Sequence, residues 1–499
     1  MITNIIIMSF YGRRKELALL GKLCRRLPGI IVVTGRRRVG KTSLIKEFIK
    51  DKKSLYFFVD NNKSIEILIH DFEDQIRDAL DIPPFVKIDT PEDLLDFLFS
   101  YQNDLVVVFD EFQRFSDLYP PFITQLQKKW DMQGESSRLF IIASGSSVGM
   151  MNKIFLEGGA PLFKRADNII RLKPFQPEEI FDFLDNIGVQ DREEKLKLYL
   201  LFGGMIYYYR LFEKYECSDF DSALSTLIFD EFGPLKNEIR DVLVEEFGRL
   251  HPTYYEIISA LARGRSTQKE IADMTHIAPG SLSVYLNNLI HLLGVVEYRV
   301  PATDDPNRSK KGRYFLKDNF FRFYARFIYP NMSRFISGRE GDSVSIRNMV
   351  DTEWQSYSGL IFEDLAVSLL SDRYSANYDR TGGWWNRRGD EIDFIALGEG
   401  MIPVAVEMKN RVMTAGDALE VIDRLEHKIQ LIPGFFRDLN KNQVGESNRE
   451  TAALDETGHS TFCGVAAKGM AEGDRAVLKE KGYLFFDVFE LIENHGKRR

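Results

Sequence analysis

Cysteine and histidine are scarce in this sequence. Cys24, Cys217 and Cys463 are the three cysteines among 499 residues, none of them in CxxC spacing, and the seven histidines are scattered. Neither a disulfide framework nor a structural zinc site is therefore supported. Such a cysteine content fits a reducing cytoplasm.

Long apolar runs and an excess of basic charge are also missing. No stretch approaches the length of a membrane span, and the N-terminal MITNIIIMSF has neither the basic region nor the cleavage site of a signal peptide. We therefore expect a soluble, untargeted, cytoplasmic protein with no membrane partner. The formal net charge of −8 argues against non-specific coating of nucleic acid, so any contact with DNA must come from a local basic strip.

The rest of the composition is that of a folded, multidomain chain. Hydrophobic residues make up 44% and charged residues 28%, close to the averages of globular proteins, and 499 residues exceed what one core usually supports. From Gly29 the pattern is strand, glycine-rich loop, helix, and apolar strands at 55–59, 105–109 and 139–143 alternate with helical segments. This alternation predicts an α/β domain over residues 1–175, with a parallel sheet covered on both faces.

Three further regions follow this first domain. Residues 176–245 lose the strand signal and predict a helical lid. Residues 246–330 predict three helices followed by a hairpin, the pattern of a winged helix-turn-helix. Residues 331–499 predict a separate α/β domain that opens with a helix around Gly359–Ser371. Its polar stretch 438–460 is a long loop or a disordered insertion.

The first domain contains a phosphate-binding motif. Gly35, Gly40, Lys41 and Thr42 match GxxxxGK[ST] between an apolar strand and a helix. Glycines let the backbone approach the phosphates, Lys41 reaches the β and γ phosphates, and Thr42 ligates Mg²⁺. The three arginines of the loop either strengthen the positive electrostatic potential around the phosphates or are ordinary exposed charged residues. The loop residues expected to bind ATP are Gly35, Arg36, Arg37, Arg38, Val39, Gly40, Lys41, Thr42 and Ser43.

A pair of carboxylates is expected to complete this site. The apolar run LVVVFDE ends in Asp110 and Glu111, and in a parallel sheet such residues reach the carboxyl edge, where ligands bind. Asp110 is expected to hold Mg²⁺, directly or through water, and Glu111 to orient and polarise the attacking water. ATP and Mg²⁺ are therefore the predicted cofactors, and ATP hydrolysis is the predicted activity.

These motifs resemble, in order, those of a known family. FYGRRKEL, TGRRRVGKTSLI, VVVFDEFQRF, IIASGSS, PLFKR and the Gly203-Gly204 pair are similar to the archaeal ATPase family of the AAA and STAND superfamily. The segment GGWWNRRGDEID is typical of the restriction-endonuclease-like domain at the C-terminus of that family. Because the family's opening motif begins near Phe10, Met8 is an alternative start to Met1.

The resemblance also implies roles for individual residues. These residues are Tyr11, Gly12 and Arg13 near the adenine, Ser144 or Ser146 on a sensor strand near the γ-phosphate, and Arg165 as the arginine finger. The alternative for Arg165 is an ordinary surface arginine, because an arginine finger is defined by geometry that a sequence does not show.

The C-terminal region carries a second set of charged residues. In PVAVEMKN the strand period of two places Glu407 and Lys409 on one face, and Asp393 precedes this strand by a hairpin length. An Asp followed by ExK on paired strands resembles the PD-(D/E)xK nuclease core, with Glu363 on the preceding helix as its accessory acid. The three acids are then expected to bind Mg²⁺ and Lys409 to position the water. A degenerate, inactive nuclease fold is the alternative.

Two functions remain open at this stage. One is an ATPase that handles DNA through its nuclease-like domain, and the other is a nucleotide switch that binds DNA or protein without cutting. The complete acidic set favours the first, whereas the expected recognition helix SLSVYLNNLIHLL lacks Lys and Arg and favours the second. A homo-oligomer or a partner protein is left open. If DNA binds, we expect it to contact the basic residues at the tip of the hairpin. The alternative is that this tip is only a solvated basic turn. The residues are Arg308, Lys310, Lys311 and Arg313.

Overall fold

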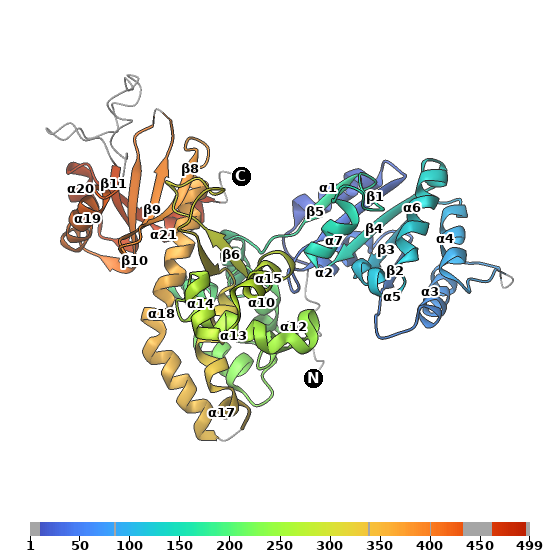
Figure 1. Cartoon of the computed structure of the whole chain (residues 1–499), viewed down its shortest axis with the longest axis horizontal. Helices are drawn as coiled ribbons and strands as arrows, with labels where there is room; N and C mark the ends of the chain where they lie inside the picture. Colours follow the sequence, from blue (N-terminus) through green and yellow to red (C-terminus); the bar gives the residue numbers. More distant parts are fainter. Residues whose placement is uncertain (1–9, 84–85, 338–339, 400, 433–461, 496–499) are drawn as a thin grey trace. The chain divides into compact units, whose positions relative to one another are not determined.

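The computed structural model describes residues 10–83, 86–337, 340–399, 401–432 and 462–495 (Figure 1). The alternative start at Met8 and the polar stretch 438–460 lie outside these residues. In the described part of the chain no helix is long and apolar enough to cross a membrane. The chain divides into two compact units, the first made of Met1–Phe175, Met205–Arg210 and Asn287–Gly294, and the second of Gln176–Gly204, Leu211–Leu286 and Val295–Arg499.

A parallel five-stranded sheet forms the centre of the first unit. Its strands are hydrogen-bonded in the order β2-β3-β4-β1-β5, and β1 and β3 are continuous buried runs, as expected for a sheet covered on both faces. The predicted parallel sheet is confirmed. Strands β1, β4 and β3 are parallel neighbours, so the loops that leave them lie at the same carboxyl edge of the sheet. The strands are β1 (Gly29–Thr34), β2 (Ser54–Phe58), β3 (Leu105–Asp110), β4 (Leu139–Gly145) and β5 (Asn168–Arg171).

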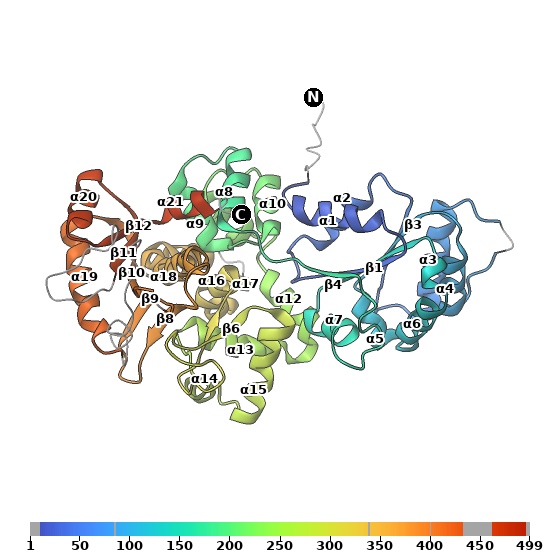
Figure 2. The same ribbon diagram turned by 90° about the horizontal axis from the view of Figure 1, so that it is seen from above.

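Helices cover both faces of this sheet, with α1 and α2 on one side and α5 to α7 on the other (Figure 2). Alternate strand residues face the two layers. Val107 of β3 packs in the cluster that contains Phe72 of α3, and on the opposite face Phe48 of α2 lies 6.0 Å from Phe140 of β4. The helices are α1 (Arg14–Cys24), α2 (Lys41–Ile49), α3 (Ile65–Ala79), α4 (Pro91–Ser100), η1 (Phe112–Arg114), α5 (Phe115–Leu118), α6 (Pro121–Gln133), η2 (Gly134–Ser136) and α7 (Val148–Phe155).

The N-terminal part of the second unit is helical and ends in a hairpin. Strands β6 (Val296–Arg299) and β7 (Arg313–Leu316) pair antiparallel after three helices, α13 (His251–Ala262), α14 (Gln268–Thr275) and α15 (Pro279–Asn288). The other helices of this part of the chain, of which η5 and the first residues of α10 belong to the first unit, are α8 (Pro177–Asn186), α9 (Arg192–Phe202), α10 (Ile206–Lys214), α11 (Phe220–Ala223), η3 (Leu224–Phe229), α12 (Glu238–Phe247), η4 (Gly248–Leu250), η5 (Leu289–Leu293), α16 (Asn319–Phe323), η6 (Tyr324–Ile328), η7 (Tyr329–Asn331) and α17 (Met332–Ser337).

The C-terminal part of the second unit is a mixed sheet with helices. Its order is β12-β11-β10-β9-β8, antiparallel from β8 to β10 and parallel from β10 to β12. A mixed sheet agrees with the expected α/β character of this region. The elements are α18 (Glu340–Tyr374), β8 (Arg380–Trp385), β9 (Glu391–Leu397), β10 (Val404–Met413), α19 (Ala415–Ile429), β11 (Phe462–Met470), α20 (Glu472–Glu480), β12 (Leu484–Asp487) and α21 (Val488–His495).

Helix α18 is much longer than the sequence pattern predicted. Only a helix around Gly359–Ser371 was expected, because the preceding residues are largely polar. The structure buries Ile346, Val350 and Tyr357 along that polar half. Their spacing is helical, so a sparse apolar stripe is enough to extend the helix when it packs against a core.

Candidate nucleotide and carboxylate sites

The loop between β1 and α2 has the backbone that its glycines permit. Gly35 has a φ of 157°, and a Cβ at this position would lie 2.6 Å from the carbonyl oxygen of Leu172. Gly40 has a φ of 99° and immediately precedes α2. Residues with a side chain are disfavoured at both positions. The loop is therefore shaped to bring backbone N–H groups and the N-terminus of α2 close to an anion.

Lys41 is held inside this loop. Its Nζ donates to the carbonyl oxygens of Gly35, at 2.8 Å, and Arg36, at 3.1 Å, and the residue is only 6% exposed. A buried ammonium with carbonyl partners keeps a positive charge at the centre of the loop, where a phosphate would meet it.

The other predicted loop residues have different environments. Val39 is buried, whereas Arg36 and Arg37 are partly exposed and Ser43 is exposed on α2. Arg38 lies over the ring of Tyr207, 4.1 Å from the centroid. Its guanidinium is therefore engaged with the Met205–Arg210 segment of the same unit.

The Tyr11-Gly12-Arg13 segment packs around Phe175. The Arg13 guanidinium lies 4.0 Å from the Phe175 ring centroid, and the Tyr11 ring lies 6.0 Å from it. Arg13 also donates to the carbonyl oxygens of Val39, at 3.2 Å, and Lys173, at 2.6 Å. This segment therefore contacts the phosphate-binding loop through Val39, and its expected contact with adenine stays a prediction.

Asp110, at the end of β3, meets the loop through Thr42. The Thr42 hydroxyl donates to Asp110 Oδ2 at 3.2 Å, and Asp110 is buried. Tyr56 of β2 donates to the same oxygen, a partner that the sequence reasoning missed. Burial, and then the neighbouring Asp110 charge, raise the pKa of Tyr56, so its phenol stays protonated as a donor. A carboxylate beside a hydroxyl is a donor set that suits Mg²⁺.

Glu111 is fixed at the carboxyl edge by two side chains. Its backbone has a φ of 57°, and its Oε2 accepts from Ser146 Oγ at 2.7 Å and from Gln113 Nε2 at 2.5 Å. Burial acts to raise the pKa of Glu111, but the hydrogen bonds from Ser146 and Gln113, together with the Lys41 charge, outweigh it and lower the pKa. The side chain is therefore ionised at neutral pH.

The two candidate sensor serines differ in their partners. Ser146 donates to Glu111, whereas Ser144, opposite Val33 of β1, is fully buried and its hydroxyl has no hydrogen-bond partner among the described residues. The Oε1 atom of buried Gln113 is likewise without a hydrogen-bond partner in the described chain. Unsatisfied buried polar atoms at a ligand edge are sites where a ligand or water is expected.

Arg165 lies apart from these contacts. Its Nε and Nη2 donate to the two oxygens of Asp131, each at 2.7 Å, and its Nη1 donates to the carbonyl of Pro161 at 3.0 Å. None of these partners belongs to the nucleotide loop. A role as an arginine finger would require Arg165 to leave Asp131, and it stays a prediction.

Two of the acidic residues predicted in the C-terminal region lie on neighbouring strands, Asp393 on β9 and Glu407 on β10, whereas Glu363 lies on α18. These strands pair antiparallel as far as Val406 and Phe394, so Glu407 and Asp393 are the first residues beyond the paired part of the ladder. Asp393 Oδ2 accepts from the backbone N–H of Met408 at 2.8 Å.

Lysines contact the Glu407 carboxylate from two elements. Lys409 Nζ lies 3.4 Å from Glu407 Oε2, and Lys428 of α19 lies 2.8 Å from Oε1. Lys428 was missed in the sequence because α19 reaches Glu407 only through the fold. The strand carboxylate therefore carries two cationic neighbours.

Crowding of carboxyls changes the acidity of this cluster. Burial, then the charges of Glu407 and Glu363, raise the pKa of Asp393 to about 8. Burial is also the main cause that raises the pKa of Glu363 to about 7, although Lys409 opposes it. The neighbouring Asp364 has the opposite shift, because Arg322 and Arg299 outweigh the effect of burial and lower its pKa.

Comparisons with known proteins match two parts of the chain. Residues 10–210 match the model of an ATPase domain predominantly from Archaea. This part of the chain is therefore similar to that family of ATPase domains. Residues 324–421 match a family of archaeal and bacterial proteins of unknown function, so the C-terminal mixed sheet lies partly in a family whose activity is not known. The matched residues include the loop around Lys41 and the carboxylates Asp110 and Glu111.

Individual proteins are also similar to this chain. An uncharacterised protein of Methanocaldococcus jannaschii is 28% identical over 433 residues, covering 85% of this chain and 92% of the relative. An uncharacterised ATP-binding protein of the same organism is 46% identical over 48 residues, which are 9% of this chain and 81% of that protein. The solved Walker-type ATPase of Pyrococcus abyssi is similar in fold, with a TM-score of 0.50 and 20% identity over 64% of this chain and 96% of that one.

Two of the four basic residues predicted to bind DNA at the β6–β7 hairpin are paired with acids of the second unit. Lys311 pairs with Asp304 at 3.1 Å and Arg313 with Glu391 at 2.6 Å. Arg308 is 89% exposed and lies 3.9 Å from an Asp305 oxygen, and Lys310 is also exposed. The predicted basic strip is therefore reduced to a tip of two exposed cations. Its contact with DNA stays a prediction.

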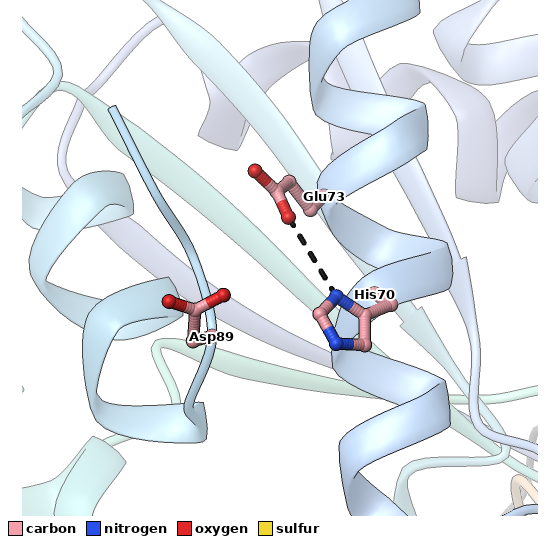
Figure 3. Close-up of side chains that lie close together, drawn as sticks. All are labelled: His70, Glu73 and Asp89. Carbon is pink, nitrogen blue, oxygen red and sulfur yellow. Dashed lines mark ion pairs between the residues drawn. The ribbon is translucent and has the colours of Figure 1, made fainter. Parts of the chain in front are cut away.

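The ATPase domain contains one further cluster that sequence reasoning missed. His70 and Glu73 lie one turn apart on α3, and Asp89 precedes α4 (Figure 3). One ligand atom from each lies within 4.8 Å of the others, the only group of three so close among the described residues. The sequence shows the i, i+3 spacing of His70 and Glu73, but only the fold adds Asp89.

Proposed function

We propose that the ATPase domain binds ATP with Mg²⁺ and hydrolyses it at the carboxyl edge between β1 and β3. The observation that carries this proposal is the hydrogen bond between Thr42 and Asp110, which joins the phosphate-binding loop to the acidic strand. The hydroxyl and carboxylate oxygens there fit Mg²⁺, which would neutralise charge on the β and γ phosphates. The family match and the buried Lys41 are further support.

Each residue has a separate task in this mechanism. Lys41 binds the β and γ phosphates, and Thr42 and Asp110 hold the cation. Glu111, kept ionised by its donors, would accept a proton from the attacking water while the water oxygen bonds to the γ-phosphorus and the bond from that phosphorus to the β–γ bridging oxygen breaks, which releases ADP and inorganic phosphate. Gln113 and Ser146 position the Glu111 carboxylate.

Nucleotide binding is tested with Lys41→Ala. The variant removes the cation that faces the phosphates, so the affinity for Mg·ATP in a fluorescence or calorimetric titration should fall at least about tenfold. Lys50→Ala, which removes a lysine just beyond the C-terminal end of α2, is the matched control and should bind as the parent does. An unchanged affinity in Lys41→Ala would remove Lys41 from the site.

A second proposal concerns the C-terminal sheet: it is a PD-(D/E)xK nuclease fold that cuts DNA with a divalent cation. Support comes from the pairing of β9 with β10, which sets Asp393 beside Glu407, and from the raised pKa values of Asp393 and Glu363, which a bound cation would reverse. In this mechanism the acids hold Mg²⁺, and Lys409 assists the water and the developing phosphate charge. The β6–β7 hairpin and the preceding helices would act as a winged helix that binds the DNA backbone.

Cleavage is tested by incubating plasmid and linear DNA with the full chain, with Mg²⁺ or Mn²⁺ and with or without ATP. Asp393→Ala should abolish metal-dependent cutting while ATP turnover persists. Asp390→Ala, in the turn before β9, is the control and should cut DNA. If the parent cuts no DNA under any of these conditions, or if Asp393→Ala cuts equally well, the alternative holds: a nucleotide-controlled switch that binds DNA or a protein partner through an inactive nuclease fold.

A further inference from the structure

We propose that His70, Glu73 and Asp89 form a binding site for Zn²⁺ on the surface of the ATPase domain. The three side chains come from α3 and from the segment that leads into α4, and they face a common space (Figure 3). The site is separate from the phosphate-binding loop, so this inference goes beyond ATP hydrolysis and does not depend on it.

The donor set selects the class of ion. One imidazole nitrogen and two carboxylate oxygens suit zinc, whereas Mg²⁺ and Ca²⁺ prefer oxygen donors alone. Three protein ligands leave a fourth, tetrahedral position for water. Two carboxylates and a neutral imidazole also supply the negative charge that a dication requires.

Arg77 orients the Glu73 carboxylate for this role. Its Nε and Nη2 both donate to Glu73 Oε1, at 3.1 and 2.5 Å, and its Nη2 donates to the carbonyl of Val86 at 2.6 Å. Oε2 is left facing His70 Nδ1 at 3.8 Å. That separation is too long for a hydrogen bond but close to the roughly 3.4 Å between two donors on a tetrahedral ion with bonds of about 2.1 Å.

The backbone on both sides of the site is fixed by the core. On α3, His70 lies between the buried Ile69 and Phe72. On the other side, Asp89 follows Ile88, which is 0% exposed, and precedes Thr90, the N-cap of α4. The backbone of each ligand is therefore anchored, and small rotations of the exposed His70 and Asp89 side chains would bring ligand atoms that already lie within 4.8 Å of one another onto one ion.

Zinc binding is tested on the full chain, stripped of metal and free of nucleotide. Competition against a chromophoric chelator should give one Zn²⁺ per chain at micromolar affinity or tighter, and zinc should raise the thermal midpoint. His70→Gln and Asp89→Asn should each lose this equivalent and the thermal shift. His427→Gln, at an exposed histidine of α19, is the control and should keep both.

Two results would overturn the proposal. One is equal zinc binding by the parent, His70→Gln and Asp89→Asn. The other is binding that appears only at millimolar zinc, which would mean an adventitious ion only. His70 and Asp89 are exposed, so each variant should keep the parent's thermal midpoint in the absence of metal, and this measurement tests folding separately from zinc binding.

Discussion

The two carboxylate sites of this protein are built in opposite ways. At the edge of the parallel sheet, Glu111 accepts from Ser146 and Gln113, and its pKa lies below the ordinary range. In the C-terminal region, Asp393 and Glu363 are partly buried near other acids, and their pKa values rise to about 8 and about 7. The difference teaches that the first site is ionised by the protein's own donors, whereas the second needs an added cation to be fully ionised at neutral pH.

The strongest challenge to this comparison is Glu111→Gln. An amide can occupy the same position but cannot take a proton from water, so ATP turnover should fall by roughly 100-fold or more, with nucleotide affinity retained. Phosphate release and a binding titration measure the two effects. Release at the parental rate would show that Glu111 is not the base.

The ionisation of Glu111 can be probed through Gln113→Ala. Loss of this donor raises the pKa of Glu111, because the Gln113 hydrogen bond acts to lower it. On the acid side, turnover should then begin to fall at a higher pH than in the parent, with ATP affinity unchanged. The measurement is the pH profile of kcat, and Gln102→Ala, at an exposed glutamine, is the control. A loss that is equal at every pH would assign Gln113 a purely structural role.

The C-terminal cluster should show the opposite dependence on pH. Because the folded Asp393 and Glu363 bind protons more tightly than ordinary carboxyls, their contribution to stability is complete below about pH 4. It is lost as the pH rises through about 7 to 8. The thermal midpoint of the metal-free chain should therefore decline over this window, by on the order of 2–4 °C per kcal/mol lost.

Asp393→Asn is the variant that isolates this effect. Its midpoint should decline less steeply with pH than that of the parent, since one titrating group is gone. Mg²⁺ at pH 8 should raise the midpoint of the parent and leave the variant nearly unchanged. Parallel slopes in the two proteins would contradict the raised pKa of Asp393.

The smallest expected effect is at the hairpin tip. Replacing Arg308 and Lys310 together by Ala should reduce the salt dependence of any DNA binding by about two phosphate contacts. Lys311 and Arg313 are paired with acids, so their replacement should alter the salt slope less. Equal effects from both pairs would show that the ion pairs open on DNA.

Much of the first unit could be predicted from the sequence because its signals are local. The motif around Lys41 and the apolar run before Asp110 each specify a strand and its edge, and the sheet brings the two edges together. The same holds for Glu407 and Lys409, whose spacing on one strand sets their common face.

What could not be predicted depends on contacts between distant segments. Tyr56 reaches Asp110 from a neighbouring strand, Lys428 reaches Glu407 from a helix, and Asp89 approaches His70 from another loop. The hydrophobic periodicity of a sequence does not show which distant residues come into contact. The polar first half of α18 was missed for a related reason, since its few apolar residues gain meaning only from the core they meet.

The β6–β7 hairpin has a consequence for how this chain can be divided. The connection between its strands is built into the C-terminal sheet: the Ala302 N–H donates to the carbonyl of Gly383 at 2.9 Å, and Trp385 Nε1 donates to the carbonyl of Lys311 at 2.7 Å. Ala302 also lies in the apolar core beside Trp384. A recombinant fragment that begins at residue 331 would lack the β6–β7 connection that packs on β8, and Trp384 and Trp385 would become exposed to solvent. An expression boundary placed before β6 keeps the sheet edge closed.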